Sequence, residues 1–198
     1  MKLYLAPGAC SLADHIALHE ADLEFERVTV DLKTKTTESG EDYRRINPKG
    51  YVPALVLDDG QMLTENIAIL SWITDQASGL MPEGPLGRYR LLETLAYIST
   101  EVHKSFKPFF SPDADEAQKA KAREIIEQRL GLLSDQVGSD YLFGAKASAA
   151  DAYLYVMLRW SKQNRVSIPA PLAAFIARME SRPAVKLALH HEGLSQPA

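Results

Sequence analysis

Cys10 is the only cysteine among the 198 residues, and its position suggests chemistry. It lies in Pro7-Gly8-Ala9-Cys10-Ser11, between an apolar run that predicts a strand over 2–5 and a pattern that predicts a helix over 11–20. Backbone N–H groups and the positive end of the helix dipole meet at such a turn, so we expect the pKa of Cys10 to be lowered. The alternative is a small buried apolar side chain, the ordinary role of a free cysteine.

The second cysteine of a Cys-x-x-Cys motif is missing, because Ala13 occupies its position. A reactive Cys10 would therefore form a disulfide only with a thiol from outside the chain. A single cysteine also excludes an internal disulfide and favours a reducing compartment. We therefore expect a cytoplasmic protein.

Charge and hydropathy exclude several other classes of protein. The formal net charge is −4, and no basic run suggests a nucleic-acid surface. The apolar stretch before Cys10 is too short for a signal peptide and is interrupted by Pro7-Gly8. No segment approaches the ~20 uninterrupted apolar residues of a membrane span. We expect neither a nucleic-acid partner nor a membrane partner.

A proline directly precedes an apolar strand in Tyr51-Val52-Pro53-Ala54. Proline belongs at the edge or start of a strand, because it cannot donate to the ladder of hydrogen bonds. A trans bond is the default, since only about 5–6% of such bonds are cis. A cis Val52–Pro53 bond would turn the backbone N–H and C=O of Val52 outward, where an extended peptide pairs with them as an added strand.

Thr64-Glu65-Asn66 opens a predicted helix over 65–74. The free N–H groups of a helix start bind a carboxylate, and Glu65 supplies an acceptor for an ammonium group. Together they fit the head of a zwitterionic α-amino acid. The alternative is simple capping by Thr64 with an acidic first turn.

Histidines at two places in the chain raise further possibilities. In a predicted helix over 88–106, the side chains of Ala96, Thr100, His103 and Lys107 share one face at helical spacing. His103 is then a hydrogen-bond donor or base at a cleft, or simply part of an exposed face. His15 and His19 are four residues apart, but a metal site needs three or four convergent ligands and no third is evident. We therefore predict no metal.

The two halves of the chain have different patterns. Residues 1–78 predict an α+β domain of order βαβαββα, in which helices cover a small mixed sheet. The strands are expected at 2–5, 25–30, 54–57 and 61–63, and the helices at 11–20, 42–46 and 65–74, with a loop over 33–40.

Residues 79–87 are rich in glycine and proline and predict a linker. Residues 88–198 predict an all-helical domain. Its helices are expected at 88–106, 116–138, 149–162, 171–181 and 184–190. Ser148 and Asp151 have the spacing of a capping box at the start of the third of these.

These segments together resemble the cytosolic glutathione transferases, specifically the bacterial beta class. The matching stretches are Lys2–Tyr4, Pro7–Ala13, Asn47–Leu55, Leu63–Asn66, Ala68-Ile69, Glu101–Lys104, Ser148–Tyr153 and Leu158–Trp160. The resemblance implies a thioredoxin-like N-terminal domain, an all-helical C-terminal domain and a homodimer. It also implies glutathione as co-substrate, with no other cofactor, and a small hydrophobic electrophile as second substrate.

The resemblance assigns roles to individual residues. Cys10, with Ser11 beside it, would face the glutathione sulfur, and His103 and Lys104 would lie beside the thiol. Val52, before a cis Pro53, would pair with the cysteinyl backbone. The remaining assignments are Glu65 and Asn66 for the γ-glutamyl head, Lys35 for the glycyl carboxylate, Glu101 for glutathione on the partner subunit, and Trp160 for the apolar wall of the second-substrate pocket.

The sequence departs from the family pattern at two positions. Ala96 replaces an asparagine that contributes to the thiol network, so control of sulfur ionisation would rest more on Cys10 and His103. Asn66 replaces a serine, but we expect glutathione affinity to survive because backbone N–H groups bind the carboxylate.

Several functions are consistent with these residues. The leading hypothesis is conjugation of the glutathione thiolate to an electrophile. A second is thiol–disulfide exchange through a Cys10–glutathione mixed disulfide, resolved by another glutathione. The others are a non-catalytic carrier of apolar ligands and an assembly module; the retention of Cys10, Pro53 and Glu65 disfavours the module.

Overall fold

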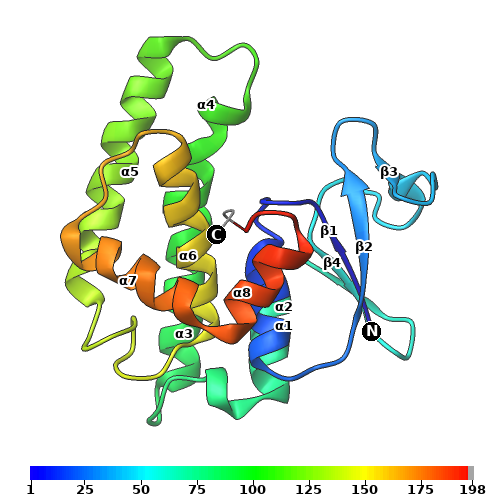
Figure 1. Cartoon of the computed structure of the whole chain (residues 1–198), viewed down its shortest axis with the longest axis horizontal. Coiled ribbons are helices and arrows are strands. Elements are labelled where there is room, and N and C mark those ends of the chain that lie inside the picture. The colour runs from blue at the N-terminus through cyan, green and yellow to red at the C-terminus, as the bar shows by residue number, and fades with distance from the viewer. Residues whose placement is uncertain (196–198) are drawn as a thin grey trace. The chain divides into compact units, whose positions relative to one another are not determined.

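The computed structural model of the protein describes residues 1–195, which form two compact units (Figure 1). The first unit contains Met1–Ser78 and residues 181–195, and the second contains Gly79–Glu180. The helical pattern of the sequence predicts a single domain over residues 88–198. The structure differs because the last helix, α8 (Pro183–His191), packs on α1 (Leu12–Glu20). A local pattern predicts a helix but not the neighbour against which it packs.

A five-stranded mixed sheet forms the frame of the first unit, in the order β3-β2-β1-β4-β5. The strands are β1 (Lys2–Leu5), β2 (Glu26–Asp31), β3 (Thr36–Thr37), β4 (Ala54–Val56) and β5 (Met62–Thr64). Strand β1 pairs parallel with β2 and antiparallel with β4. The loop predicted over 33–40 contains β3, which pairs antiparallel with β2. A strand of two residues is too short to show a recognisable alternation of polar and apolar side chains.

Helix α1 is buried along most of its length, from Leu12 to Leu18. It packs against both α2 (Asn66–Gln76) and α8, which explains why even its polar residues Asp14 and His15 are inaccessible. The short 3₁₀ helix η1 (Tyr43–Arg45) replaces the predicted helix over 42–46. Helix α1 therefore begins next to the Cys10 turn as a rigid, fully packed element.

A cluster of apolar side chains holds the segment before β4 against the sheet. Val52 is buried in this cluster beside Tyr4, Val28, Val30 and Tyr43. The rings of Tyr4 and Tyr43 lie 5.5 Å apart between centroids. This core fixes the position of the backbone at Val52.

The second unit is helical. Its elements are η2 (Ser78–Leu80, at the boundary of the two units), α3 (Gly87–Tyr97), η3 (Ile98–Val102), η4 (His103–Phe106), α4 (Lys107–Phe110), α5 (Glu116–Gln136), α6 (Ala149–Gln163) and α7 (Ala170–Ser181). Among residues 1–195, no helix is both long and apolar enough to cross a bilayer.

The single helix predicted over 88–106 is wrong. Helix α3 passes into the π turn η3, which is followed at once by the 3₁₀ turn η4 that begins at His103. A π turn inserts a residue into the helical repeat, and such turns are frequent at functional sites. The 3.6-residue spacing used to place Ala96 and His103 on one face therefore does not hold across this segment.

The predicted capping box at the start of α6 is confirmed. The buried carboxylate of Asp151 accepts hydrogen bonds from the backbone N–H and the hydroxyl of Ser148, both at 2.7 Å. It also accepts one from the backbone N–H of Leu142 at 2.9 Å. One side chain thus fixes both the helix start and the loop before it.

Replacing Asp151 by alanine should lower the free energy of unfolding by about 3 kcal/mol, because buried donors lose a charged acceptor. Urea unfolding followed by circular dichroism measures this change. The control is Asp135→Ala at an exposed position of α5, which should cost less than about 0.5 kcal/mol. Equal stabilities of the two variants would contradict this role of Asp151.

Candidate functional site

The Cys10 turn is closed by hydrogen bonds on both sides of the cysteine. The N–H of Ala9 donates to the carbonyl of Ala6 at 3.0 Å, and the N–H of Leu12 donates to the carbonyl of Ala9 at 3.1 Å. The buried hydroxyl of Ser11 accepts from the N–H of Ala6 at 3.2 Å and lies 3.4 Å from its carbonyl. The hydroxyl of Ser11 therefore closes the turn that presents Cys10.

The Cys10 thiol lies against the segment that carries Val52. Its Sγ donates to the backbone carbonyl of Val52 at 3.5 Å. The Val52–Pro53 peptide bond is cis, as the family resemblance required. The structure thus brings together two residues that the sequence singled out separately.

The expected low pKa of Cys10 is wrong for the free protein. Burial and, secondarily, the charge of the nearby Asp14 carboxyl raise the pKa of this thiol to about 12. Hydrogen bonds from the backbone N–H groups of Cys10 and Ser11 lower it, but they are outweighed. Desolvation of the anion exceeds the favourable effect of the helix start, so Cys10 is a neutral thiol at neutral pH.

Asn66 links the start of α2 to the Cys10 turn. Its side-chain amide donates to the carbonyl of Cys10 and to Oδ2 of Asp14, each at 2.9 Å. Burial raises the pKa of Asp14 well above its ordinary value. The side chain of Asn66 is thus engaged within the protein, while its backbone N–H lies in the first turn of a helix, where no intrahelical acceptor exists.

Glu65 stands immediately before α2 with a φ of +73°. Thr64 was predicted to cap this helix, but Glu65 occupies the cap position and its side chain makes no capping hydrogen bond. A side chain in this backbone region costs of order 1–3 kcal/mol, and such residues cluster at active sites and ligand clamps. The carboxylate oxygen Oε1 accepts instead from the hydroxyl of Tyr51 at 2.9 Å and from Nζ of Lys49.

The segment over 47–51 supplies residues that the sequence reasoning missed as partners of the site. Asn47 is buried, and its amide donates to the carbonyl of Tyr51 at 2.8 Å. Lys49 donates to Thr64 Oγ1 at 2.9 Å as well as to Glu65. Asn47 therefore holds the backbone before Val52, and Lys49 holds the Glu65 carboxylate.

Lys35 reaches the same segment. It has a φ of +61°, and its N–H donates to the carbonyl of Asp31 at 2.8 Å. Its Cδ lies 3.9 Å from the point where a Cβ on Gly50 would stand. The structure therefore places Lys35 beside the loop that holds Glu65.

His103 and Trp160 lie together in the second unit. The Nδ1 atom of His103 is 2.6 Å from the hydroxyl of Tyr153, and its ring meets the Trp160 ring edge-on at 5.0 Å between centroids. Burial and, secondarily, the charge of Lys104 lower the pKa of His103 to about 4. His103 is therefore a neutral imidazole at neutral pH.

The other two predicted residues of this unit have separate surroundings. Glu101 forms an ion pair with Arg129 at 3.0 Å. Lys104 is exposed and lines an open pocket of about 560 Å³ together with Lys107 and Lys121.

Comparison with known proteins gives the same family for both halves of the chain. The glutathione S-transferase N-terminal domain matches residues 9–76, and the C-terminal domain of the same family matches residues 100–191. The chain is 43% identical to glutathione S-transferase GstA of Escherichia coli O157:H7, over 98% of this chain and 100% of that protein.

Solved structures agree with this match. A sphingomonad glutathione S-transferase complexed with glutathione is 48% identical, with a TM-score of 0.91 over 98% of this chain and 100% of that chain. A bacterial beta class glutathione S-transferase from Sphingomonas chungbukensis is 43% identical, with a TM-score of 0.90 over the same shares. The chain belongs to the glutathione S-transferase family of enzymes.

Proposed function

We propose that this enzyme binds glutathione along the face formed by Cys10, Val52 and the start of α2, and transfers its thiolate to a small apolar electrophile. The observation that carries the proposal is the set of hydrogen bonds that joins these segments. The Cys10 thiol donates a hydrogen bond to the carbonyl of Val52, and the Asn66 amide donates one to the carbonyl of Cys10. An extended tripeptide with a central thiol fits a peptide edge that lies next to a cysteine and ends at a helix N-terminus.

The two ends of glutathione have charges that match this face. The γ-glutamyl carboxylate would accept from the backbone N–H groups at the start of α2, and its ammonium would bind the Glu65 carboxylate. Glu65 already accepts from one ammonium group, that of Lys49, which supports this role. Lys35 would bind the glycyl carboxylate, since its side chain lies beside the same loop.

Cys10 is proposed to donate a hydrogen bond to the glutathione sulfur. The thiolate attacks the electrophilic carbon, a carbon–sulfur bond forms, and the leaving group departs with the electron pair of its bond. A neutral S–H next to the thiolate stabilises the anion and lowers the pKa of glutathione. A thiol whose own pKa is about 12 suits this donor role and disfavours the alternative of disulfide exchange by a Cys10 thiolate.

His103 is proposed as a second donor. If the Tyr153 hydroxyl donates to Nδ1, the proton of the neutral imidazole is on Nε2. Nε2 would then donate a hydrogen bond to the glutathione sulfur. A pKa of about 4 makes this imidazole a poor base for a thiol, so donation suits it better than proton abstraction. Trp160 is proposed for the wall of the second-substrate pocket, and Ser11, Pro53, Lys104 and Glu101 keep the supporting roles that the family resemblance implies.

We further infer a cytoplasmic homodimer that acts in detoxification. The lone cysteine suits a reducing compartment. Leu86 and Tyr89, at the start of α3, are large apolar side chains with high exposure, as expected of a surface that a second subunit covers.

Two replacements of Cys10 test whether its thiol donates a hydrogen bond to the glutathione sulfur or forms a disulfide with it. Cys10→Ala should lower kcat/KM for a model aryl halide by about 10- to 100-fold, because one hydrogen bond to a charged group is lost. Cys10→Ser keeps an O–H donor and should recover most of that loss. If both variants were equally inactive, the sulfur itself would be required and disulfide exchange would be favoured.

Mass spectrometry after exposure to oxidised glutathione provides the matching control for exchange. A mixed disulfide on Cys10, reversed by reductant, would support that alternative. Binding of apolar dyes without turnover of any electrophile by the unmodified protein would instead favour the carrier function and contradict the proposal.

Glu65→Gln should weaken binding of reduced glutathione about tenfold, or ~1.4 kcal/mol, because the ammonium loses its charged acceptor. Isothermal titration calorimetry measures this change. The control is Glu116→Gln, because Glu116 is another exposed carboxylate paired with a lysine, and that variant should bind normally. Unchanged affinity in Glu65→Gln would remove Glu65 from the binding site.

A further inference from the structure

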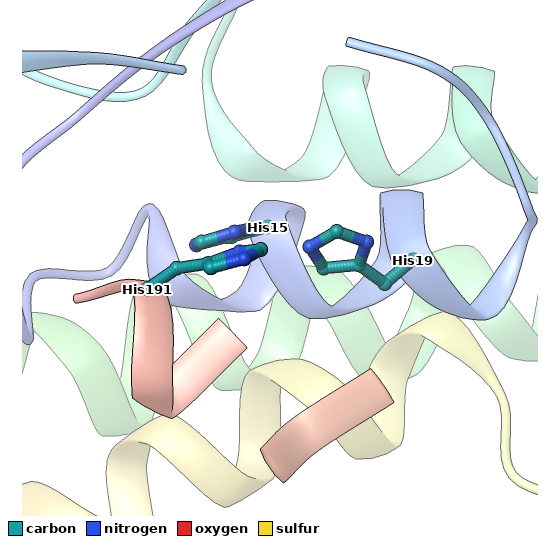
Figure 2. Close-up of side chains that lie close together, drawn as sticks. All are labelled: His15, His19 and His191. Atoms are coloured by element: carbon teal, nitrogen blue, oxygen red, sulfur yellow. The ribbon is translucent and has the colours of Figure 1, made fainter. Parts of the chain in front are cut away.

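Three histidines of the first unit converge at the junction of α1 and α8 (Figure 2). His15 and His19 lie one turn apart on α1, and His191 is the last residue of α8. One ring nitrogen of each lies within 4.8 Å of those of the other two. The ring centroids are 5.0 to 5.7 Å apart, and the rings of His15 and His191 are stacked.

Two of these imidazoles have a buried nitrogen with no partner among the described residues. The Nε2 atoms of His15 and His19 are both inaccessible, and neither makes a hydrogen bond. The whole side chain of His15 is buried. A buried polar atom without a partner costs about 1–3 kcal/mol, so a ligand that meets both nitrogens would be stabilising.

A carboxylate holds the innermost imidazole by its other nitrogen. The Nδ1 atom of His15 lies 2.8 Å from Oε1 of Glu192, which is also buried. The second carboxylate oxygen accepts from the N–H of Gly8 at 2.8 Å. In metal sites the ligating histidine typically donates its remaining N–H to a carboxylate, and this fixes the opposite nitrogen as the ligand.

The surroundings of His19 also suit a cation. Beside His19 an open pocket of about 630 Å³ is lined partly by the carboxylates of Asp22, Glu24 and Glu26, which offers a route for a hydrated cation.

We propose that His15, His19 and His191 bind one divalent transition metal ion of the zinc class. Three imidazoles and an open fourth position suit zinc, and also copper and nickel. At metal–nitrogen distances of 2.0–2.1 Å, tetrahedral ligand nitrogens lie about 3.4 Å apart. The nitrogens of the cluster lie within 4.8 Å of one another, so rotation of the rings would bring them closer to bind an ion.

The ion would join α1 to α8. Through His15 and Glu192 it would also stabilise the turn at Gly8, two residues before Cys10. The prediction of no metal rested on the lack of a third ligand. That ligand comes from the far end of the sequence, beyond the reach of helical spacing.

The test uses the full chain without a polyhistidine tag, freed of metal with a chelator, in a Cys10→Ser background that removes the thiol as a competing ligand. Titration with Zn²⁺ should give one site per chain and a higher Tm, because the ion binds the folded state. Co²⁺ should give the visible absorption of a tetrahedral site.

Substitutions of two histidines of the cluster and of the neighbouring His190 test whether the cluster binds the ion. His19→Gln and His191→Gln should each weaken Zn²⁺ binding at least tenfold and abolish the rise in Tm. His190→Gln is the matched control, since His190 is exposed, adjacent in sequence and outside the cluster, and it should bind normally. Absence of binding by the parent chain, or equal binding by all three variants, would overturn the proposal. So would an equal loss in His190→Gln and His191→Gln, which would indicate surface binding only.

Discussion

Desolvation of the Cys10 thiol is the constraint on which the rest of the site depends. The turn that opens α1 brings two backbone N–H groups toward the sulfur, and in open solvent they would favour a thiolate. Packing of α1, α2 and the Val52 segment around the turn reverses that preference, and the pKa of the thiol rises to about 12. In the free protein the sulfur thus keeps its proton, which is directed at the Val52 carbonyl. In the proposed reaction this proton turns to the glutathione sulfur.

The remaining residues of the first unit keep this arrangement rigid. An apolar core fixes Val52, the Ser11 hydroxyl closes the turn, and the Asn66 amide ties α2 to Cys10. Glu65 is held before α2 by Tyr51 and Lys49. A tripeptide that binds here meets preformed partners along its length, and this lowers the entropy lost on binding.

Features with a local signal were predicted from the sequence. The capping box of Ser148 and Asp151 depends on residues three apart, and the strands expected at 54–57 and 61–63 are neighbours in the chain that pair as β4 and β5. The positions of Cys10 and Glu65 at helix starts likewise follow from nearby residues. These local features also carry the family resemblance, so the fold could be predicted from the sequence.

Features that depend on packing were not predicted. The pKa of Cys10 is set by elements that surround it in space, and the π turn before His103 leaves no mark in the apolar periodicity. Similarly, the meeting of His191 with His15 follows from the packing of α8 on α1, which no local pattern encodes.

The most direct test of the account is the pH dependence of Cys10 alkylation by iodoacetamide in the free protein. Only the thiolate reacts, so the rate follows its fraction. A pKa of about 12 predicts a rate that rises about tenfold per pH unit through pH 10 without a plateau. A plateau below pH 8 would mean that Cys10 is a thiolate near neutral pH, and would contradict its role as a neutral hydrogen-bond donor.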